Sequence, residues 1–98
     1  MSDIDICFEG TVKGGRYFVV MPNGEQSRLT FVAIGDDHII ADHTFVPPPY
    51  RNNGVGEAMV ERLIADARAR KLKITPTCWF VADEFARHRP EWDDVLAR

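Results

Sequence analysis

The chain has 98 residues, of which 45% are hydrophobic and 28% are charged, and its formal net charge is -3. A chain of this length supports one hydrophobic core, so we expect a single domain over residues 1–98. The excess of acids and the scattered basic residues argue against nucleic acid as the main partner. No apolar run approaches the roughly 18 residues of a membrane span, and the first residues lack a basic leader, so a cytoplasmic protein without membrane contact is expected.

The first half of the chain alternates short β-rich runs with turns. Pro22-Asn23-Gly24 is typical of a hairpin, and Leu29, Phe31 and Ala33 alternate with other residues as in a strand with one buried face. These patterns predict an antiparallel meander of four strands, at residues 4–9, 15–21, 27–34 and 39–46.

The second half predicts one long helix over residues 54–70, because apolar side chains recur there on one stripe. That stripe consists of Val60, Leu63, Ile64 and Ala67. Asp66 and Arg70 are spaced for an ion pair on its surface. A short strand at residues 73–77 should lie parallel to strand 39–46, since strand, helix and strand follow one another. A short helix at 83–88 and a turn at 92–96 complete an α+β fold with a mixed, mostly antiparallel sheet and one β-α-β unit.

The segment between strand 39–46 and the long helix is the most informative. After three prolines it reads Tyr50-Arg51-Asn52-Asn53-Gly54-Val55-Gly56-Glu57 and enters the helix directly. A helix N-terminus offers unpaired amides and a partial positive charge, so it can hold phosphate oxygens without a lysine. Gly54 and Gly56 carry no Cβ and should let a pyrophosphate approach these amides, with Arg51 adding a charge-assisted contact.

Two well-known phosphate-binding loops do not match this segment. A dinucleotide-binding loop needs a third glycine where Met59 stands, and a P-loop needs a following Gly-Lys-Ser or Gly-Lys-Thr, which is absent. A plain turn that caps a helix remains an alternative.

The loop resembles that of the GNAT superfamily of acyl-CoA-dependent N-acyltransferases, which reads Arg-x-x-Gly-x-Gly and follows a strand that ends in valine. Here the loop residues are Arg51, Gly54 and Gly56, and the valine is Val46. The chain also resembles the small, single-domain acetyltransferase-like branch of that superfamily, through His43-Thr44-Phe45-Val46-Pro47 and Pro76-Thr77-Cys78-Trp79-Phe80-Val81. The resemblance extends over about residues 16–96.

This resemblance implies acetyl-CoA as a substrate, bound between strands 39–46 and 73–77. The spacing of the three histidines suggests no metal site, so no metal is expected. The pyrophosphate would lie on Asn52, Asn53, Gly54, Val55, Gly56 and Glu57, near Arg51, and the pantetheine arm along Thr44, Phe45 and Val46. An amine would attack the thioester directly while a strand amide polarises the carbonyl. The paired helices that enclose the acceptor in larger relatives are missing, so the acceptor side should be open, and the amine acceptor, which could be carried by a protein, is left unidentified. Phe85 stands near the place of their acidic tyrosine and has no hydroxyl.

Two side chains are catalytic candidates. Cys78 follows the second of these strands, and its thiol could protonate the leaving group, accept the acyl group or merely fill space. His43 should share a face with Ile39, Ala41 and Phe45, where it could act as a base or have a structural role. We expect Cys7 and Cys78 to be free thiols.

The aromatic residues Trp79, Phe80, Phe85 and Trp92 are expected to form core, although one of them could face a partner. The leading function is an N-acetyltransferase. The alternatives are a CoA-binding module without catalysis and a partner-binding module that retains only the fold.

Overall fold

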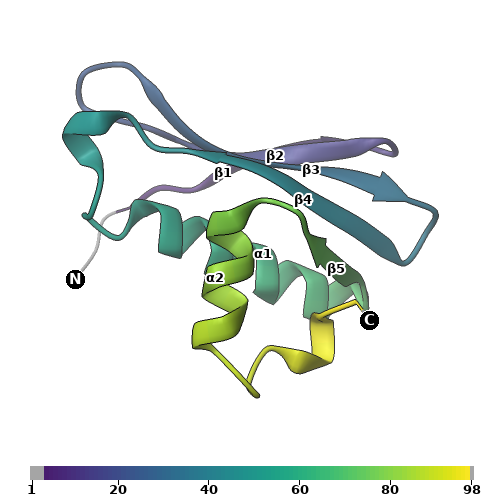
Figure 1. Ribbon diagram of the computed structural model, residues 1–98. Helices are drawn as coiled ribbons and strands as arrows, with labels where there is room; N and C mark the ends of the chain where they lie inside the picture. The colour runs from purple at the N-terminus through teal and green to yellow at the C-terminus, as the bar shows by residue number, and fades with distance from the viewer. Residues whose placement is uncertain (1–3, 98) are drawn as a thin grey trace.

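The computed structural model describes residues 4–97, which form one sheet and two α-helices (Figure 1). The predicted strands and the long helix are present, with ends that differ from the prediction by at most three residues. The elements are β1 (Cys7–Thr11), β2 (Gly14–Val20), β3 (Gln26–Ile34), β4 (His38–Phe45), α1 (Val55–Arg70), β5 (Lys73–Pro76) and α2 (Trp79–Arg87), with short 3-10 turns η1 (Pro48–Tyr50) and η2 (Asp93–Val95).

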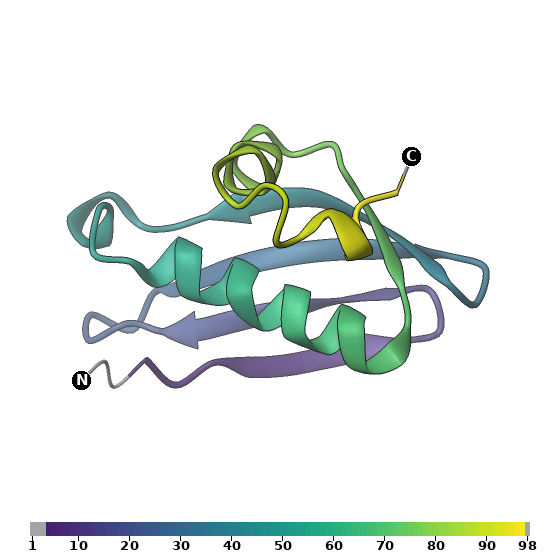
Figure 2. The same ribbon diagram turned by 90° about the horizontal axis from the view of Figure 1, so that it is seen from below.

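The sheet has the order β1-β2-β3-β4-β5, and its first four strands form the predicted antiparallel meander. Strand β5 lies parallel to β4, with Ile39 opposite Ile74, because α1 carries the chain back across the sheet. Figures 1 and 2 show that α1 and α2 both cover the same face of the sheet. The face toward the helices is called the inner face below. The α+β class with a β-α-β unit is therefore confirmed.

The core lies between this inner face and the helices. The predicted stripe of α1 is buried, and it packs against β2 and β3. Removing these side chains from water supplies most of the stabilisation, about 25 cal/mol per Å² of apolar surface. The buried hydrophobic residues are Tyr17, Val19, Met21, Leu29, Ile39, Ala41, Val55, Met59, Val60, Leu63, Ile64, Ala67, Ile74, Val81, Phe85, Trp92 and Val95.

Helix α2 begins at Trp79, four residues before the predicted start at Asp83. Cys78 is extended, and its carbonyl accepts the first helical bond, from the amide of Ala82 at 3.0 Å. The residue at the N-cap position is therefore Cys78, and its side chain makes no capping hydrogen bond. Since the usual capping residues are Ser, Thr, Asp and Asn, the sequence does not mark this start. The earlier start places Trp79 and Phe80 in the first turn of α2.

The surface of α1 also differs from the sequence prediction. Asp66 does not pair with Arg70. It accepts a hydrogen bond from the buried hydroxyl of Tyr17 at 2.6 Å and pairs with Arg62 at 3.3 Å, while Arg70 lies over the ring of Phe8. The pairing follows tertiary contact with β2 rather than helical spacing alone. Burial and the Asp66 carboxylate raise the pKa of Tyr17.

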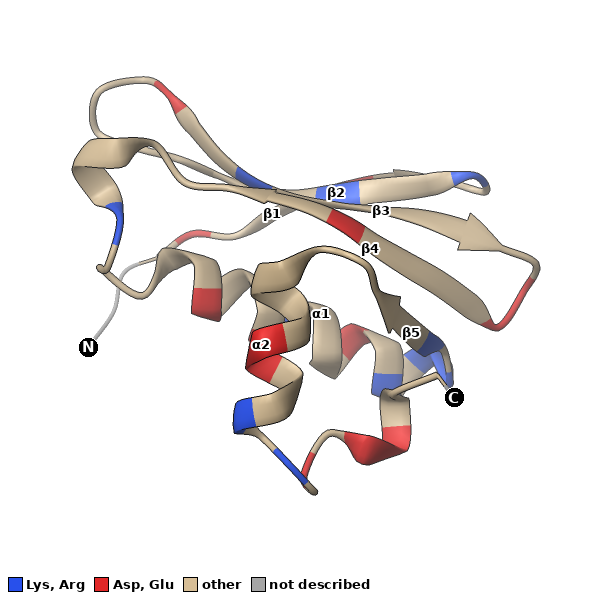
Figure 3. Cartoon of the chain, in the orientation of Figure 1, with Lys and Arg blue, Asp and Glu red and all other residues tan. Residues whose placement is uncertain are grey.

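Basic residues near the end of α1 lie beside acidic residues of η2 (Figure 3). Arg68 forms an ion pair with Asp94 at 2.8 Å and also donates to the carbonyl oxygen of Glu91. These contacts hold the C-terminal segment against α1. None of the described helices has the length and apolar character needed to cross a membrane.

Candidate functional site

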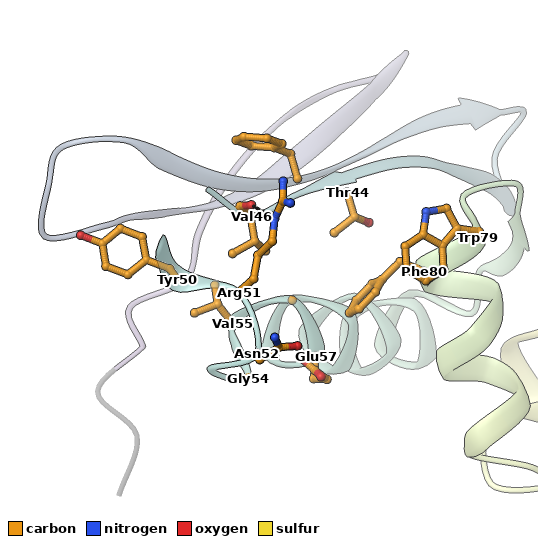
Figure 4. A pocket seen from close by; sticks show the side chains of 12 residues that line it. Thr44, Val46, Tyr50, Arg51, Asn52, Gly54, Val55, Glu57, Trp79 and Phe80 are labelled. Carbon is orange, nitrogen blue, oxygen red and sulfur yellow. Dashed lines mark hydrogen bonds between the residues drawn. The ribbon is translucent and has the colours of Figure 1, made fainter. Parts of the chain in front are cut away.

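A pocket of about 380 Å³ opens where β4 leaves the sheet and α1 and α2 begin (Figure 4). Three segments meet at it: the end of β4, the loop and first turn of α1, and the first turn of α2. Most of the predicted binding residues lie in its wall; Asn53 does not. The lining residues are Thr44, Phe45, Val46, Tyr50, Arg51, Asn52, Gly54, Val55, Gly56, Glu57, Trp79 and Phe80.

The pocket exists because β4 and β5 separate. Their ladder ends with Ala41 opposite Pro76, and the amides of Thr77 and Cys78 both donate to the carbonyl oxygen of Ala41 at 3.1 Å. Proline has no amide hydrogen to continue the ladder, and the chain then turns into α2. Beyond Ala41, β4 continues to Phe45 without β5 beside it, which leaves the gap that α2 and the loop surround.

A β-bulge at Asp42 sets which side chains of β4 point into this gap. Thr30 of β3 lies opposite His43, whereas Phe31 lies opposite Ala41, so Asp42 is the extra residue. An extra residue moves every later side chain to the other face. Thr44, opposite the buried Leu29, therefore faces inward toward the pocket.

The same bulge overturns the predicted orientation of His43. Thr30 donates a hydrogen bond to Asp42 at 2.7 Å, and His43 lies opposite Thr30. The side chains of Asp42 and His43 therefore both lie on the outer face, with that of Thr30. The expectation that His43 shares a face with Ile39 and Ala41 is wrong, because the alternation of the strand does not continue through the bulge. His43 does share a face with Phe45, which lies opposite Arg28. His43 is exposed and does not line the pocket.

The first turn of α1 forms one wall of the pocket. Gly54 precedes the helix with a φ of 83°, and no side chain among the described residues caps the helix. A Cβ built on Gly54 would meet nothing within 4 Å, so the space in front of these amides is open. A positive φ disfavours residues with a Cβ, and the uncapped amides are available to an anion.

Gly56 has a packing role that the sequence did not predict. A Cβ at this position would lie 2.9 Å from the ring of Phe80, which packs against the first turn of α1. Its missing side chain allows α2 to approach α1. Gly56 also lines the pocket, and its contact with a pyrophosphate stays a prediction.

Arg51 lines the pocket, and its guanidinium is held at the start of the loop. Its Nε donates to the carbonyl oxygen of Val46 at 2.8 Å, and the group lies 5.9 Å from the centre of the Phe45 ring. This contact fixes the loop at the end of β4. It also occupies one of the strand carbonyls that the resemblance assigns to the pantetheine arm.

Cys78 lies directly behind the pocket wall. Its thiol contacts the hydroxyl oxygen of Thr44 at 3.5 Å, across the gap between the two strands. Thr44 lines the pocket, whereas Cys78 is partly buried and does not. Both Cys7 and Cys78 are free thiols, as predicted.

Two acidic residues, one on α1 and one on α2, are close enough for their charges to interact. Glu57 lines the pocket, while Glu84 of α2 is only 3% exposed. Burial raises the pKa of the Glu84 carboxyl above its ordinary value, and the charge of Glu57 adds to this rise. Of these two acids, Glu57 is the one that lines the pocket.

Tyr50, Trp79 and Phe80 line the pocket and were missed as site residues. The hydroxyl of Tyr50 accepts a hydrogen bond from the amide of Asn23 at 3.1 Å, which ties the loop to the β2–β3 hairpin. Trp79 is 77% exposed, so its prediction as core is wrong, whereas Phe85 and Trp92 are buried as predicted. A sequence prediction that began α2 at Trp79 would have placed Trp79 and Phe80 opposite the glycine loop.

Residues 16–95 match the model of the GCN5-related N-acetyl-transferase family. The chain belongs to this family. The match contains the whole pocket and covers most of the chain, which confirms the resemblance to the GNAT superfamily. A search among curated protein sequences gave no significant match.

A solved structure supports the same fold. The solution structure of a "GCN5-like putative N-acetyltransferase" from Staphylococcus aureus matches with a TM-score of 0.70 and 24% identity, over 99% of this chain and 91% of that one. At this identity the likeness establishes the fold of this family member. Among its described residues, no group of three or more His, Cys, Asp and Glu is placed to hold a metal ion.

Proposed function

We propose that this family member binds acetyl-CoA in the pocket at the start of α1 and transfers the acetyl group to an amine. The observation that carries the proposal is the open space before the uncapped first turn of α1, next to the gap between β4 and β5. An anion with a long thin arm fits this arrangement. The anion would lie at the helix amides and the arm would enter the gap.

The residues present fit such a ligand. Backbone amides from Gly54 to Glu57 would hold the pyrophosphate through hydrogen bonds and the helix dipole, and Arg51 would add positive charge. Thr44 and Val46 line the path toward the gap, and Asn53 stays outside the wall. Acetyl-CoA would supply the acetyl group as an activated thioester.

Few side chains of this chain need to take part in the transfer. A neutral amine forms the new C–N bond as the C–S bond of the thioester breaks. The nitrogen then gives up one proton, and the sulfur that leaves takes one up. The thiol of Cys78, in contact with Thr44 beside the pocket, is the proposed proton donor. His43 lies on the other face of the sheet, so we do not propose it as the base.

Transfer is tested by incubating the protein with acetyl-CoA and a panel of primary amines. Free CoA thiol is measured with a chromogenic reagent, and the acetylated amine is identified by mass. We expect thiol release that depends on both the amine and the protein.

Phe85 carries no hydroxyl, which favours a second candidate, a CoA-binding module without catalysis. Tight CoA binding with no acetylated amine would support that candidate and contradict the first.

A further inference from the structure

The arginines in the part of the chain that the structure describes divide into two groups. Members of the first group form ion pairs with carboxylates; they are Arg16, Arg62, Arg68, Arg87 and Arg89. Members of the second group each lie over an aromatic ring and form no ion pair with a described carboxylate; they are Arg28, Arg51 and Arg70. Arg28 and Arg51 share one ring, that of Phe45. Two guanidiniums without a carboxylate partner therefore meet at one place.

The ring of Phe45 brings together parts of the chain that are distant in the sequence. Phe45 lies opposite Arg28 in the β3–β4 ladder, and Leu29, the next residue of β3, is buried on the inner face, so Phe45 and Arg28 both lie on the outer face. The centre of the ring is 4.9 Å from the guanidinium of Arg28 and 5.9 Å from that of Arg51. Phe45 also lines the pocket. The two cations therefore stand at the edge of the pocket, where β4 ends.

Arg51 connects this ring with the loop before α1. Figure 4 shows its side chain running from the loop toward the end of β4, while Asn52 and Glu57 lie on the side of the helix. Only its Nε donates a hydrogen bond within the described residues, to the carbonyl oxygen of Val46, and the guanidinium of Arg28 donates none there. A guanidinium has five N–H donors in a planar fork. Most donors of both groups are therefore open to a ligand.

The chemistry of these two cations suits a phosphate monoester. Two like charges at one ring repel each other, and contact with the ring at a partly exposed position offsets this repulsion only weakly. An anion bound by both guanidiniums would remove the repulsion and accept hydrogen bonds from both forks. A phosphate monoester carries close to two negative charges at neutral pH and has three acceptor oxygens. It can therefore engage both arginines at once.

We propose that Arg28 and Arg51 hold the 3′-phosphate of acetyl-CoA, and that Arg28 makes the site selective for CoA esters over thioesters that lack this phosphate. This inference rests on the proposed function, because it concerns the same ligand. With the pyrophosphate on the helix amides, the next group of the ligand is the ribose that carries the 3′-phosphate. Arg51 is the residue of the loop that contacts Phe45, so the loop leads from those amides to the two guanidiniums.

Calorimetric titration of the whole chain with CoA and with 3′-dephospho-CoA tests this subsite without turnover. We expect the wild type to bind CoA roughly tenfold more tightly than 3′-dephospho-CoA. Arg28→Gln should lose most of this difference by weakening the affinity for CoA alone, whereas Arg28→Lys should keep part of it because the charge remains. Arg16→Gln is the matched control and should keep the full difference, since Arg16 lies on the same face over the ring of Phe18 and does not line the pocket.

The outcomes separate this inference from the proposed function. Equal dissociation constants of the two ligands for the wild type would overturn the subsite, and so would an unchanged ratio in a folded Arg28→Gln variant. Equal losses in Arg28→Gln and Arg16→Gln would reveal only a general effect of charge and would overturn it as well. A wild type that binds neither ligand would contradict the proposed function and this inference together. A preference for CoA that depends on Arg28, without acetylation of any amine, would support the subsite and contradict the transfer alone.

Discussion

The thiol of Cys78 lies 3.5 Å from the hydroxyl oxygen of Thr44, across the gap where β4 and β5 separate. Thr44 faces this gap only because the bulge at Asp42 turns the end of β4. The contact joins the last residue before α2 to the strand that lines the pocket. The thiol of Cys78 therefore lies next to a residue of the pocket wall.

The first prediction concerns Cys78. If its thiol protonates the leaving sulfur, Cys78→Ala should lower kcat by roughly 100-fold, and Cys78→Ser should retain part of the rate because a hydroxyl can still donate. Cys7→Ala is the matched control and should leave kcat unchanged. The rates come from steady-state thiol release with saturating acetyl-CoA.

Two different roles for Cys78 would give distinct results. A covalent route predicts that both variants are nearly inactive and that acetyl-CoA alone adds one acetyl mass to the wild type at Cys78. A packing role predicts a loss of about 1 kcal/mol in the free energy of unfolding with an unchanged kcat. An unchanged kcat in a folded Cys78→Ala variant would exclude both catalytic roles.

The second prediction separates the two glycines of the loop. Gly54→Ala should weaken acetyl-CoA binding by at least roughly tenfold, because its Cβ would project into the open space before the helix amides. Gly24→Ala is the control, since Gly24 also has a positive φ and open space around it but does not line the pocket. The dissociation constants are measured by calorimetric titration. Equal affinities in both variants would contradict a phosphate site at Gly54.

Gly56→Ala should instead lower stability. The added Cβ would press on the ring of Phe80, and overpacking of this kind typically costs about 1–3 kcal/mol. A Phe80→Leu change in the same chain should recover part of the loss, because it removes the ring that the Cβ meets. Chemical denaturation followed by circular dichroism measures the free energies. Unchanged stability in Gly56→Ala would show that α2 does not pack on α1 as described.

The fourth prediction concerns Glu57. Its carboxylate lines the pocket where phosphates are proposed to bind, so Glu57→Gln should strengthen acetyl-CoA binding, by roughly threefold at low salt. The gain should shrink as salt screens the charge. Arg51→Ala should have the opposite effect and weaken binding without abolishing it. Weaker binding in Glu57→Gln would place the phosphates elsewhere.

The fifth prediction concerns pH. Burial raises the folded-state pKa of Glu84 above its unfolded value, so its contribution to stability is fully present at low pH and is lost as the pH rises through the folded pKa. Glu84→Gln should therefore be more stable than the wild type at neutral pH, and the difference should vanish at acidic pH. Glu61→Gln, at an exposed position on α1, is the control. A variant whose advantage is independent of pH would contradict this account.

The sequence predicted the loop and α1 well because glycine and proline mark their ends by local geometry. It could not predict the bulge at Asp42, since no glycine or proline stands there and alternation alone assigns His43 to the wrong face. The start of α2 was missed because Cys78 is not a capping residue. For these two reasons, neither the inward orientation of Thr44 nor the position of Trp79 on the pocket wall was predicted.

Packing between distant elements was equally invisible. Nothing near Gly56 in the sequence indicates that the ring of Phe80 occupies the space where a side chain would lie. The two residues meet only because α2 packs on α1. The same holds for Asp66, whose hydrogen bond to Tyr17 replaces a pair that helical spacing favours. Local patterns predicted the elements, and tertiary contacts decided which side chains reach the site.

A thermal unfolding titration with acetyl-CoA tests the central claim most directly, because a ligand that binds only the folded state raises the melting temperature. At a concentration roughly one hundred times Kd, the wild type should gain about 2.7 kcal/mol, which corresponds to a rise of roughly 10 °C or more for a domain of this size. Gly24→Ala should show the same rise and Gly54→Ala a much smaller one. A wild-type melting temperature that does not change with acetyl-CoA would contradict the proposed site.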